Sequence, residues 1–597
     1  MDESLKPEQV LTDAKWPTVS LSSALAYARQ TAGAHKAEAL AGCLLLLMAA
    51  NLLTTIARKT ITNDETVLIP AAYYHLAAGD SQLVHELPPL CKLIAGVPLL
   101  FIQPDEVKPE KVALLTNPSE RGWAYQENFW QDNSARFQTI SFWARVPAAL
   151  LTLTLGVLVF YFTRELFSAR AAVLAVFLFA LEPTVLAHGR VVQTDIPATF
   201  GYLLVCYTLY HYIRGRTWRR AALVGAAAGL ALLGKYSMLI VAPLLVVVLL
   251  WLLWRAPQGG ERRVALAFHA CLAVLAALFV VNAAYYFHSR ALTDADAQWV
   301  AVSFPTSFRA VWLSVRVLKR LVPTDFVLGI YWQVRHNREG HSASLLGMYS
   351  QHGWWYYFPV AFALKTTLPF LLLSLASVGW AIYRLIVKHE RLFLVLIIPL
   401  VVYTAFVMMS NINIGVRYFL PAYPFLFILG GAFLDRLPAL NHGRGAGLLL
   451  GLLLLCSVGV EAIRAYPNYM TYMNQLASPR PHWYYLSDSN VEWGDEVGEL
   501  AEYLRAHGET KVRAALLGGY ATVGYSGVEY QDALSLPDPE KPGTRYVAIG
   551  ASFLNGSTVP GRAGLSDEQR VNFFDAYRRR TPEVVFGGSI YLYRMNE

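Results

Sequence analysis

Long apolar runs recur along most of this sequence and constrain its fold more than any other feature. The hydrocarbon core of a membrane is roughly 30 Å thick and needs about 20 apolar residues for each crossing helix. Runs of this kind lie at about 38–57, 140–162, 171–187, 197–213, 221–234, 237–254, 264–287, 355–383, 392–410, 416–434 and 445–465. The pattern predicts a mainly α, polytopic membrane bundle of about eleven transmembrane helices.

Composition supports the same class. Of the 597 residues, 55% are hydrophobic and only 15% are charged, whereas ordinary soluble domains have a lower apolar share and a higher charged share. The five cysteines are scattered and have neither metal-ligand nor redox spacing. We therefore expect an integral membrane protein without a disulfide framework and without a cofactor. A divalent metal is compatible with the sequence, but no motif indicates one.

Short basic loops predict how the helices are oriented. RGRTWRR at 214–220 and RAPQGGERR at 255–263 are both rich in arginine, and such loops lie on the cytoplasmic side. Both can lie there only if the chain between them crosses the membrane twice. The first run is expected to be a retained span, because no small-residue cleavage site follows it. The expected division is a cytoplasmic segment 1–37, a transmembrane domain 38–466 with outer loops 58–139 and 288–354, and a periplasmic domain 467–597.

Unusual polar residues are expected at the outer ends of these helices. The adjacent carboxylates Asp64 and Glu65 follow the first run, while Lys235 and Arg417 lie at the outer ends of the fifth and tenth runs. Two further clusters are HELPPLCK, with His85, Glu86 and Lys92, and EPTVLAHGRVVQTDIP, with Glu182, His188, Arg190 and Asp195. Cations and carboxylates from separate segments are thus predicted to share one face of the membrane.

Cations beside carboxylates at a lipid–water boundary suit the binding of a phosphate that is attached to a lipid. Arginine makes bidentate contacts with phosphate oxygens, and lysine supplies a point charge. A neighbouring carboxylate could take the proton of a hydroxyl or amine that attacks beside that phosphate. The alternative for any single cation is that its long side chain only reaches from a helix end to the interface.

Six of these motifs, in this order, resemble the dolichyl-phosphate-mannose-protein mannosyltransferase family and its bacterial relatives (glycosyltransferase family 39). They are Asp64-Glu65, HELPPLCK, LAHGRVVQTD, GLALLGKYS, HGWWYYFPVAFALKTTLP at 352–369 and GVRYFLPAYP. YYLSDSNVEWGDEVGELAEYL at 484–504 also resembles bacterial members, so the likeness covers about residues 38–505. The resemblance implies the GT-C fold and the transfer of a sugar from a polyprenyl-phosphate carrier by a mannosyltransferase-like enzyme.

Residue chemistry and this resemblance together suggest a role for each position. Asp64, Glu65 and Asp195 are expected to be catalytic, with Asp64 as the base of an inverting displacement. The expected ligands of the carrier phosphate are Arg190, Lys92, Lys235, Lys365 and Arg417, and those of the substrate are His85, Glu86 and His188. The expected partners are the lipid-linked sugar, membrane lipid and an acceptor (protein hydroxyl, lipid or cell-wall glycan), with no nucleic acid. The expected location is the cell inner membrane, with the active site facing the periplasm.

Lys365 is a candidate because of its position within an apolar run. It lies about ten residues into the predicted span 355–383, which would place it near mid-membrane. An ionisable group there costs several kcal/mol unless it is paired or faces a polar cavity. We therefore expect a functional role for this side chain.

The last part of the sequence changes character. KVRAALLGGYATVGYSG, TRYVAIGAS and SIYLYRM are typical of short strands, and a helix is expected at about 566–580. A small α/β domain is therefore predicted after the last span. Within SDSNVEWGDE, Asp488 could bind a cation or a polar acceptor, or it could form a turn and cap the helix that follows.

The alternative from another functional class is a transporter, such as a lipid-linked sugar flippase without transferase activity. Transporters place ionisable residues near the midplane in broken helices and often contain internal repeats. Most ionisable residues here cluster at one predicted surface, and the sequence shows no repeat. The sequence therefore favours a glycosyltransferase.

Overall fold

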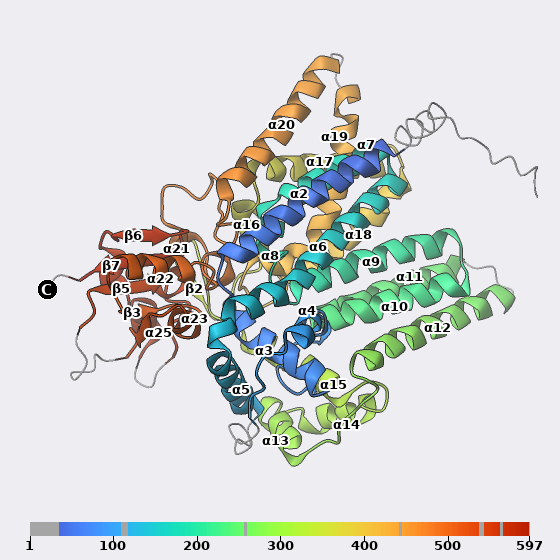
Figure 1. Ribbon diagram of the computed structural model, residues 1–597. Coiled ribbons are helices and arrows are strands. Elements are labelled where there is room, and N and C mark those ends of the chain that lie inside the picture. Colours follow the sequence, from blue (N-terminus) through green and yellow to red (C-terminus); the bar gives the residue numbers. More distant parts are fainter. Residues whose placement is uncertain are drawn as a thin grey trace, which may run out of the picture.

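Long helices make up most of the molecule, and a small α/β region lies beside one end of them (Figure 1). The computed structural model describes residues 35–108, 118–255, 260–440, 444–535, 543–561 and 565–595. The helices before residue 340 are α2 Lys36–Arg58, α3 Asn63–Ala77, α4 Leu90–Ile102, α5 Pro118–Asp132, α6 Phe137–Leu166, α7 Ala169–Leu181, α8 Pro183–His188, α9 Asp195–Arg214, α10 Trp218–Gly234, α11 Val241–Arg255, α12 Gly260–Ala284, α13 Asp294–Ser303, α14 Phe308–Leu318 and α15 Thr324–Glu339. The rest of the bundle consists of α16 Tyr357–Lys365, α17 Leu368–Ile386, α18 Leu394–Met408, α19 Tyr423–Leu440 and α20 Arg444–Ala465.

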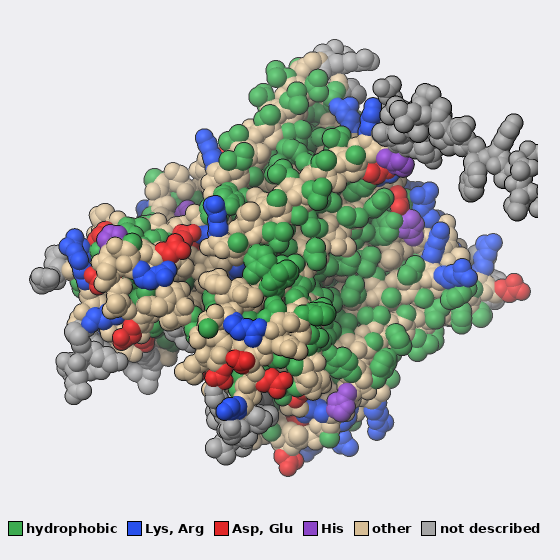
Figure 2. All heavy atoms as spheres, viewed as in Figure 1, with side chains coloured by type: hydrophobic (Ala, Val, Ile, Leu, Met, Phe, Trp, Pro, Cys, Tyr) green, Lys and Arg blue, Asp and Glu red, His purple; other side chains and the backbone are tan. Residues whose placement is uncertain are grey.

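Eight helical segments in the described part of the chain are long and apolar enough to cross a membrane. They are Lys36–Arg58, Ser134–Leu166, Tyr236–Arg255, Glu261–Ala284, Leu368–Ile386, Arg391–Met408, Val416–Pro438 and Gly445–Ala465. Hydrophobic side chains cover the helix faces seen in Figure 2, and charged side chains gather towards the helix ends and over the C-terminal region. The prediction of a mainly helical integral membrane protein is confirmed.

The other three predicted runs also form helices, but these are shorter or less apolar. The run 171–187 forms α7 and α8, the run 197–213 forms α9, and the run 221–234 forms α10. Both α9 and α10 are largely buried among their neighbours, so their side chains meet protein more than lipid. Their packing is close, since a Cβ at Gly201 would lie 2.5 Å from Ala231 Cα. Small residues that let helices approach this closely are typical of membrane interfaces, which explains their lower apolar content.

The predicted single span 355–383 is wrong, because this run is divided into α16 and α17. The break lies at Thr366 and Thr367. In a continuous helix the ring of Pro369 would clash with the carbonyl group of Lys365 four residues earlier, whereas proline is tolerated in the first turn of α17. Lys365 is therefore the last residue of a short helix, and not a residue inside a long one.

The region after α20 forms a five-stranded sheet with short helices. Its strands are β3 Lys511–Ala515, β4 Glu529–Asp532, β5 Tyr546–Gly550, β6 Val584–Phe586 and β7 Ile590–Arg594, in the order β4-β3-β5-β7-β6. The first three of these are parallel, and β7 pairs antiparallel with β5 and β6. The helices are α21 His482–Tyr485, α22 Val497–Ala506, α23 Gly519–Tyr525, α24 Ala551–Leu554, α25 Asp567–Val571 and α26 Asp575–Arg578.

Several 3-10 helices and one hairpin complete the described structure. The 3-10 helices are η2 Ser134–Arg136, η3 Tyr236–Ile240, η4 Arg391–Phe393, η5 Val416–Ala422 and η6 Asp488–Asn490. The hairpin pairs β1 Ala343–Leu345 with β2 Met348–Ser350. Of these elements, η5 and η6 contact each other and so bring a bundle segment and a C-terminal segment together.

The basic loops predict a topology that single cysteines can test. In a background without the five native cysteines, a cysteine at Thr217 or Lys388 should resist an impermeant thiol reagent in intact cells, because both loops are predicted to be cytoplasmic. A cysteine at Glu529 should react. All three native side chains are exposed in the fold, so burial would not explain protection.

Permeabilised cells provide the control, in which all three positions should react. Labelling at Thr217 together with protection at Glu529 in intact cells would contradict the predicted orientation.

Candidate active site

Asp64 lies in the first turn of α3, which begins where the chain leaves α2. The turn is fixed by a capping box, in which the Thr62 backbone N–H donates to Glu65 Oε2 at 2.8 Å. Negative charge is favoured at a helix N-terminus, which suits a carboxylate here. The Asp64 side chain is 31% exposed, and its Oδ2 accepts a hydrogen bond from Arg417 Nη1 at 2.8 Å.

Arg417 is the centre of the charged cluster. It lies near the start of η5, where Gly415 has φ +148°, and a Cβ on that glycine would lie 2.3 Å from Ser489 Oγ. Besides Asp64, its guanidinium lies 4.0 Å from Asp195 Oδ2 and 3.9 Å from Asp488 Oδ1. Three carboxylates from separate parts of the chain therefore face one buried cation.

Aromatic rings and a second cation complete this cluster. The Arg417 guanidinium carbon lies 4.2 Å from the centroid of the Trp493 ring, which is a cation–π distance. Lys235, directly after α10, donates to Asp195 Oδ1 at 2.5 Å and lies 3.4 Å from the centroid of the Tyr418 ring. Of the residues predicted from sequence, the fold brings Asp64, Asp195, Lys235 and Arg417 together.

Glu65 is turned away from this cluster and is fully buried. Its carboxylate pairs with Arg145 of α6, with Arg145 Nε at 2.8 Å from Oε1. It also accepts the backbone N–H of Val192 at 2.9 Å. Arg145 additionally donates to the carbonyl oxygens of Lys59 and Thr60. This environment indicates a structural role for Glu65, which holds the first turn of α3 against α6.

Arg190 and Lys365 hold the C-terminal region onto the bundle. Arg190 pairs with Asp495, and both side chains are buried. Lys365 Nζ donates to the carbonyl oxygens of Met470 at 2.7 Å and Asn490 at 2.6 Å. Backbone carbonyl groups thus satisfy Lys365, whereas Nε and Nη1 of Arg190 are buried without a hydrogen-bond partner in the described part of the chain.

The predicted substrate residues His188, His85 and Glu86, and the predicted phosphate ligand Lys92, differ in their exposure: some are buried and some are partly exposed. His188 is buried behind Trp493, with ring centroids 5.9 Å apart. Lys92 of α4 is buried and donates to the carbonyl oxygens of Leu83 and Val84. His85 Nδ1 lies 3.9 Å from Glu86 Oε2, and both side chains are partly exposed.

A polar cavity of about 470 Å³ adjoins the charged cluster. Its lining residues are Asn63, Asp64, Gly340, His341, Ser342, Gln351, Ile414, Arg417, Asp488, Trp493, Leu517, Ser557, Thr558, Val559, Pro560, Gly561 and Arg570. Burial raises the pKa of Asp488, and the nearby guanidinium of Arg417 opposes that rise. The cavity is large enough for a sugar or a short peptide segment, and among the predicted residues Asp64 and Arg417 line it.

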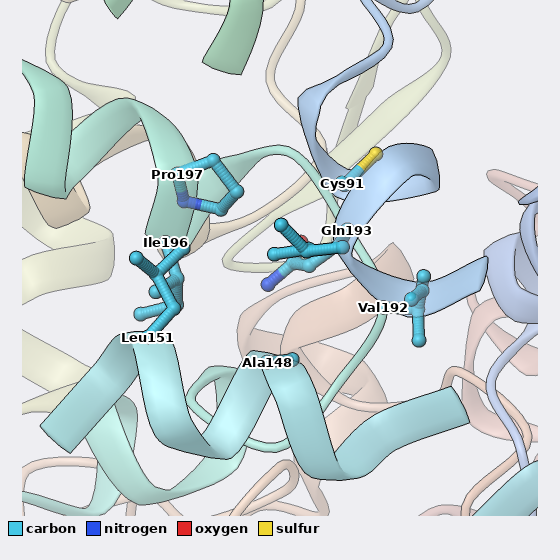
Figure 3. Close-up of a pocket in the computed structure, with 9 residues that line it drawn as sticks. Cys91, Ala148, Leu151, Val192, Gln193, Ile196 and Pro197 are labelled. Carbon is cyan, nitrogen blue, oxygen red and sulfur yellow. The ribbon is translucent and has the colours of Figure 1, made fainter. Parts of the chain in front are cut away.

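A second cavity lies close to Asp195 but cannot serve as a substrate site. It lies between α4, α6 and the start of α9, and Figure 3 shows Cys91, Ala148, Leu151 and Gln193 around it. Its volume is only about 10 Å³, which is close to the space that one water molecule needs.

Some of these site residues were missed from sequence. Arg145 lies inside a predicted apolar span, where an arginine is rare unless it has a partner, so its position was a usable signal. Trp493 and Tyr418 gave no signal, because aromatic residues are common throughout this chain. Asp488 was noted as a possible ligand-binding or capping residue. It does not cap α22, whose N-cap residue is Glu496.

The fold and this cluster define an integral membrane protein with a polar, enzyme-like site at one end of its helix bundle. No group of three or more His, Cys, Asp or Glu side chains suited to a metal ion occurs in the described ranges. The sequence model of the family described as "dolichyl-phosphate-mannose-protein mannosyltransferase" matches residues 104–293. This match confirms the resemblance seen in the motifs and indicates a glycosyltransferase. The matched range includes Arg190, Asp195 and Lys235.

None of the curated proteins compared with the chain matches it. Among solved structures, ArnT from Cupriavidus metallidurans in the apo state is similar, with 14% identity, 92% of this chain and 96% of ArnT covered, and a TM-score of 0.47. The Archaeoglobus fulgidus oligosaccharyltransferase in the apo form is 12% identical, with 86% of this chain and 70% of the oligosaccharyltransferase chain covered, and a TM-score of 0.47. A chain of the S. cerevisiae Pmt1-Pmt2 complex bound to the sugar donor is 15% identical, with 42% of this chain and 34% of that chain covered, and a TM-score of 0.31. All three TM-scores are below 0.5, so the structural likeness is loose.

The buried ion pair of Glu65 and Arg145 leads to a prediction about stability. Arg145→Gln should lower the thermal unfolding temperature of the purified protein in detergent, because it leaves the Glu65 carboxylate buried and unpaired. Breaking such a pair typically costs about 3–5 kcal/mol.

Arg164→Gln is the matched control, since Arg164 pairs with Glu38 at a site where its side chain is 41% exposed. Exposed pairs contribute about 0–1 kcal/mol, so this variant should unfold close to the wild-type temperature. Equal shifts in the two variants would refute the structural role assigned to Glu65.

Proposed function

We propose that this chain is a GT-C glycosyltransferase that moves a sugar from a polyprenyl-phosphate carrier to an acceptor at the outer face of the membrane. The acceptor is a protein hydroxyl, a lipid or a cell-wall glycan, and the enzyme is mannosyltransferase-like. We place it in the cell inner membrane, with residues 467–597 as a periplasmic domain. Asp64 acts as the base of an inverting displacement.

The observation that carries this proposal is the pairing of Asp64 with Arg417 at the wall of a polar cavity. The carboxylate is partly exposed to that cavity, while the guanidinium is almost buried. A buried arginine can bind a phosphate through two parallel hydrogen bonds. The pair therefore offers a base and a phosphate ligand at the wall of the same cavity.

In the proposed reaction, the acceptor oxygen attacks the anomeric carbon while the bond between that carbon and the phosphate oxygen breaks. The bonding electrons leave with the carrier phosphate, and Asp64 takes the proton of the attacking hydroxyl. Arg417 and Lys235 stabilise the negative charge that grows on the phosphate. Attack opposite the leaving phosphate gives inversion at the anomeric carbon. Asp195 holds Lys235 in place, which is the role that its 2.5 Å contact supports.

The lipid part of the carrier needs an apolar surface near the cluster. An apolar cavity of about 320 Å³ lies among α9, α10, α11 and α12, and its lining includes Met238 and Val241. These two residues follow Lys235 by three and six positions in the chain. We propose that the isoprenoid chain lies along this cavity while its phosphate reaches Lys235 and Arg417.

The main test of the proposed function uses Asp64→Asn. Reconstituted protein is supplied with radiolabelled undecaprenyl-phosphate sugars and a membrane fraction as the source of acceptors. The asparagine keeps the shape of the side chain but cannot take a proton, so turnover should fall by about 10² to 10⁴-fold. Binding of undecaprenyl phosphate should persist.

Wild-type protein that moves the labelled lipid across vesicles but never transfers the sugar would support the transporter alternative. Near-normal turnover of Asp64→Asn with saturating donor would remove Asp64 from the role of base.

A second prediction concerns how Arg417 binds the carrier phosphate. Arg417→Ala should weaken the binding of undecaprenyl phosphate, and Arg417→Lys should restore it poorly, because an ammonium group cannot make the bidentate contact. The measurement is equilibrium binding of labelled undecaprenyl phosphate to the purified variants.

Arg309→Ala is a suitable control, because Arg309 lies on α14, outside the charged cluster. Unchanged affinity in both Arg417 variants would leave this arginine with a structural role only.

A further inference from the structure

Among residues 487–490, Asp488 is the one that lines the polar cavity. Its neighbours Ser487, Ser489 and Asn490 are at most 1% exposed, whereas the Asp488 side chain is 17% exposed and lines the cavity. The segment carrying it lies beyond the last span, so the C-terminal region supplies part of the cavity wall. In the proposed sugar transfer, the Asp488 carboxylate has no role so far.

The backbone at Asp488 is held in an unusual conformation. Its φ is +54°, a left-handed value that is uncommon for residues other than glycine, with asparagine and aspartate enriched among the exceptions. Contacts on both sides fix it, because the Asp488 N–H donates to Ser552 Oγ at 2.8 Å and Ser489 Oγ donates to the Ile414 carbonyl oxygen at 2.6 Å. Strained residues that their surroundings hold in this way cluster at functional sites.

The carboxylate of Asp488 retains the capacity to accept hydrogen bonds. Oδ1 accepts the Ser489 N–H at 2.6 Å, and it lies 3.9 Å from Arg417 Nη2, which is too far for a hydrogen bond. Within the described ranges no hydrogen bond reaches Oδ2. A phosphate would be repelled by this carboxylate, whereas hydroxyl and amide groups could donate to it.

We propose that Asp488 is a positioning residue for the acceptor, and this inference rests on the proposed function. Its carboxylate accepts a hydrogen bond from a second donor group that lies next to the attacking hydroxyl or amine. Asp64 then takes the proton of the attacking group from the other side of Arg417. The acceptor class is therefore one with two adjacent hydrogen-bond donors, and the active site is complete only with the C-terminal region in place.

The test compares Asp488→Asn with wild type in three measurements. These are transfer of label to a membrane fraction, hydrolysis of the labelled donor by water without that fraction, and binding of undecaprenyl phosphate. The amide oxygen of asparagine can still accept a hydrogen bond but carries no negative charge, and hydrogen bonds to an ionised group are roughly twice as strong as neutral ones. The half-saturating amount of the membrane fraction should therefore rise by about 10-fold. Hydrolysis and phosphate binding should remain within about 3-fold of wild type, because neither involves the acceptor contact.

Two further variants exclude a structural explanation. Asp488→Gly removes the carboxylate while readily adopting the observed backbone conformation, so it should behave like Asp488→Asn even if the asparagine variant folds poorly. Asp80→Asn is the matched control, since Asp80 lines a different polar cavity, of about 240 Å³, and it should transfer normally.

The outcomes separate this inference from the proposed function. Unchanged half-saturation in both Asp488 variants, or parallel losses of transfer and hydrolysis, would overturn the positioning role while leaving the glycosyltransferase proposal intact. Wild-type protein with neither transfer nor hydrolysis would overturn both.

Discussion

The interaction on which the rest of the site depends is the contact between one buried guanidinium and carboxylates from three parts of the chain. Arg417 meets Asp64 from the start of α3, Asp195 from the start of α9 and Asp488 from the segment after the last span. A buried charge is tolerated only where partners compensate it. Arg417 therefore fixes the relative positions of elements that lie hundreds of residues apart in sequence, and its surroundings form the wall of the polar cavity.

Buried cations elsewhere join the C-terminal region to the bundle in the same way. Lys59, at the end of α2, contacts Glu496 and Glu499, and Arg190 pairs with Asp495. Lys365 donates to two carbonyl oxygens of the chain after α20. Several of the cations that the sequence marked as phosphate ligands thus have protein partners already. Docking of the C-terminal region explains the positions of Arg190 and Lys365, whereas Arg417 lines the polar cavity and Lys235 is joined to it through Asp195.

The sequence predicted the helical elements well and the site in part, and the difference has a physical cause. Runs of about 20 apolar residues are a local signal, so the helix positions followed directly. The break at Thr366 has a weaker signal, because Pro369 is a single residue within an otherwise apolar run. In the site, residue type and position at a helix end indicated Asp64, Asp195, Lys235 and Arg417. Which cation meets which carboxylate depends on tertiary packing, so neither the partner of Glu65 nor the docking role of Lys365 could be predicted.

The charges of the cluster link binding of the donor phosphate to the freedom of the Asp64 carboxylate. In the described part of the chain, Arg417 and Lys235 face three carboxylates of this cluster, so an arriving phosphate has to compete with Asp64 for the guanidinium. If the carrier phosphate takes that contact, as proposed, the Asp64 carboxylate loses its 2.8 Å partner and is free to accept a hydrogen bond from the attacking hydroxyl. The base would then be most effective when the donor is bound. One ion pair would in this way both organise the site and restrain its base until the sugar is in place.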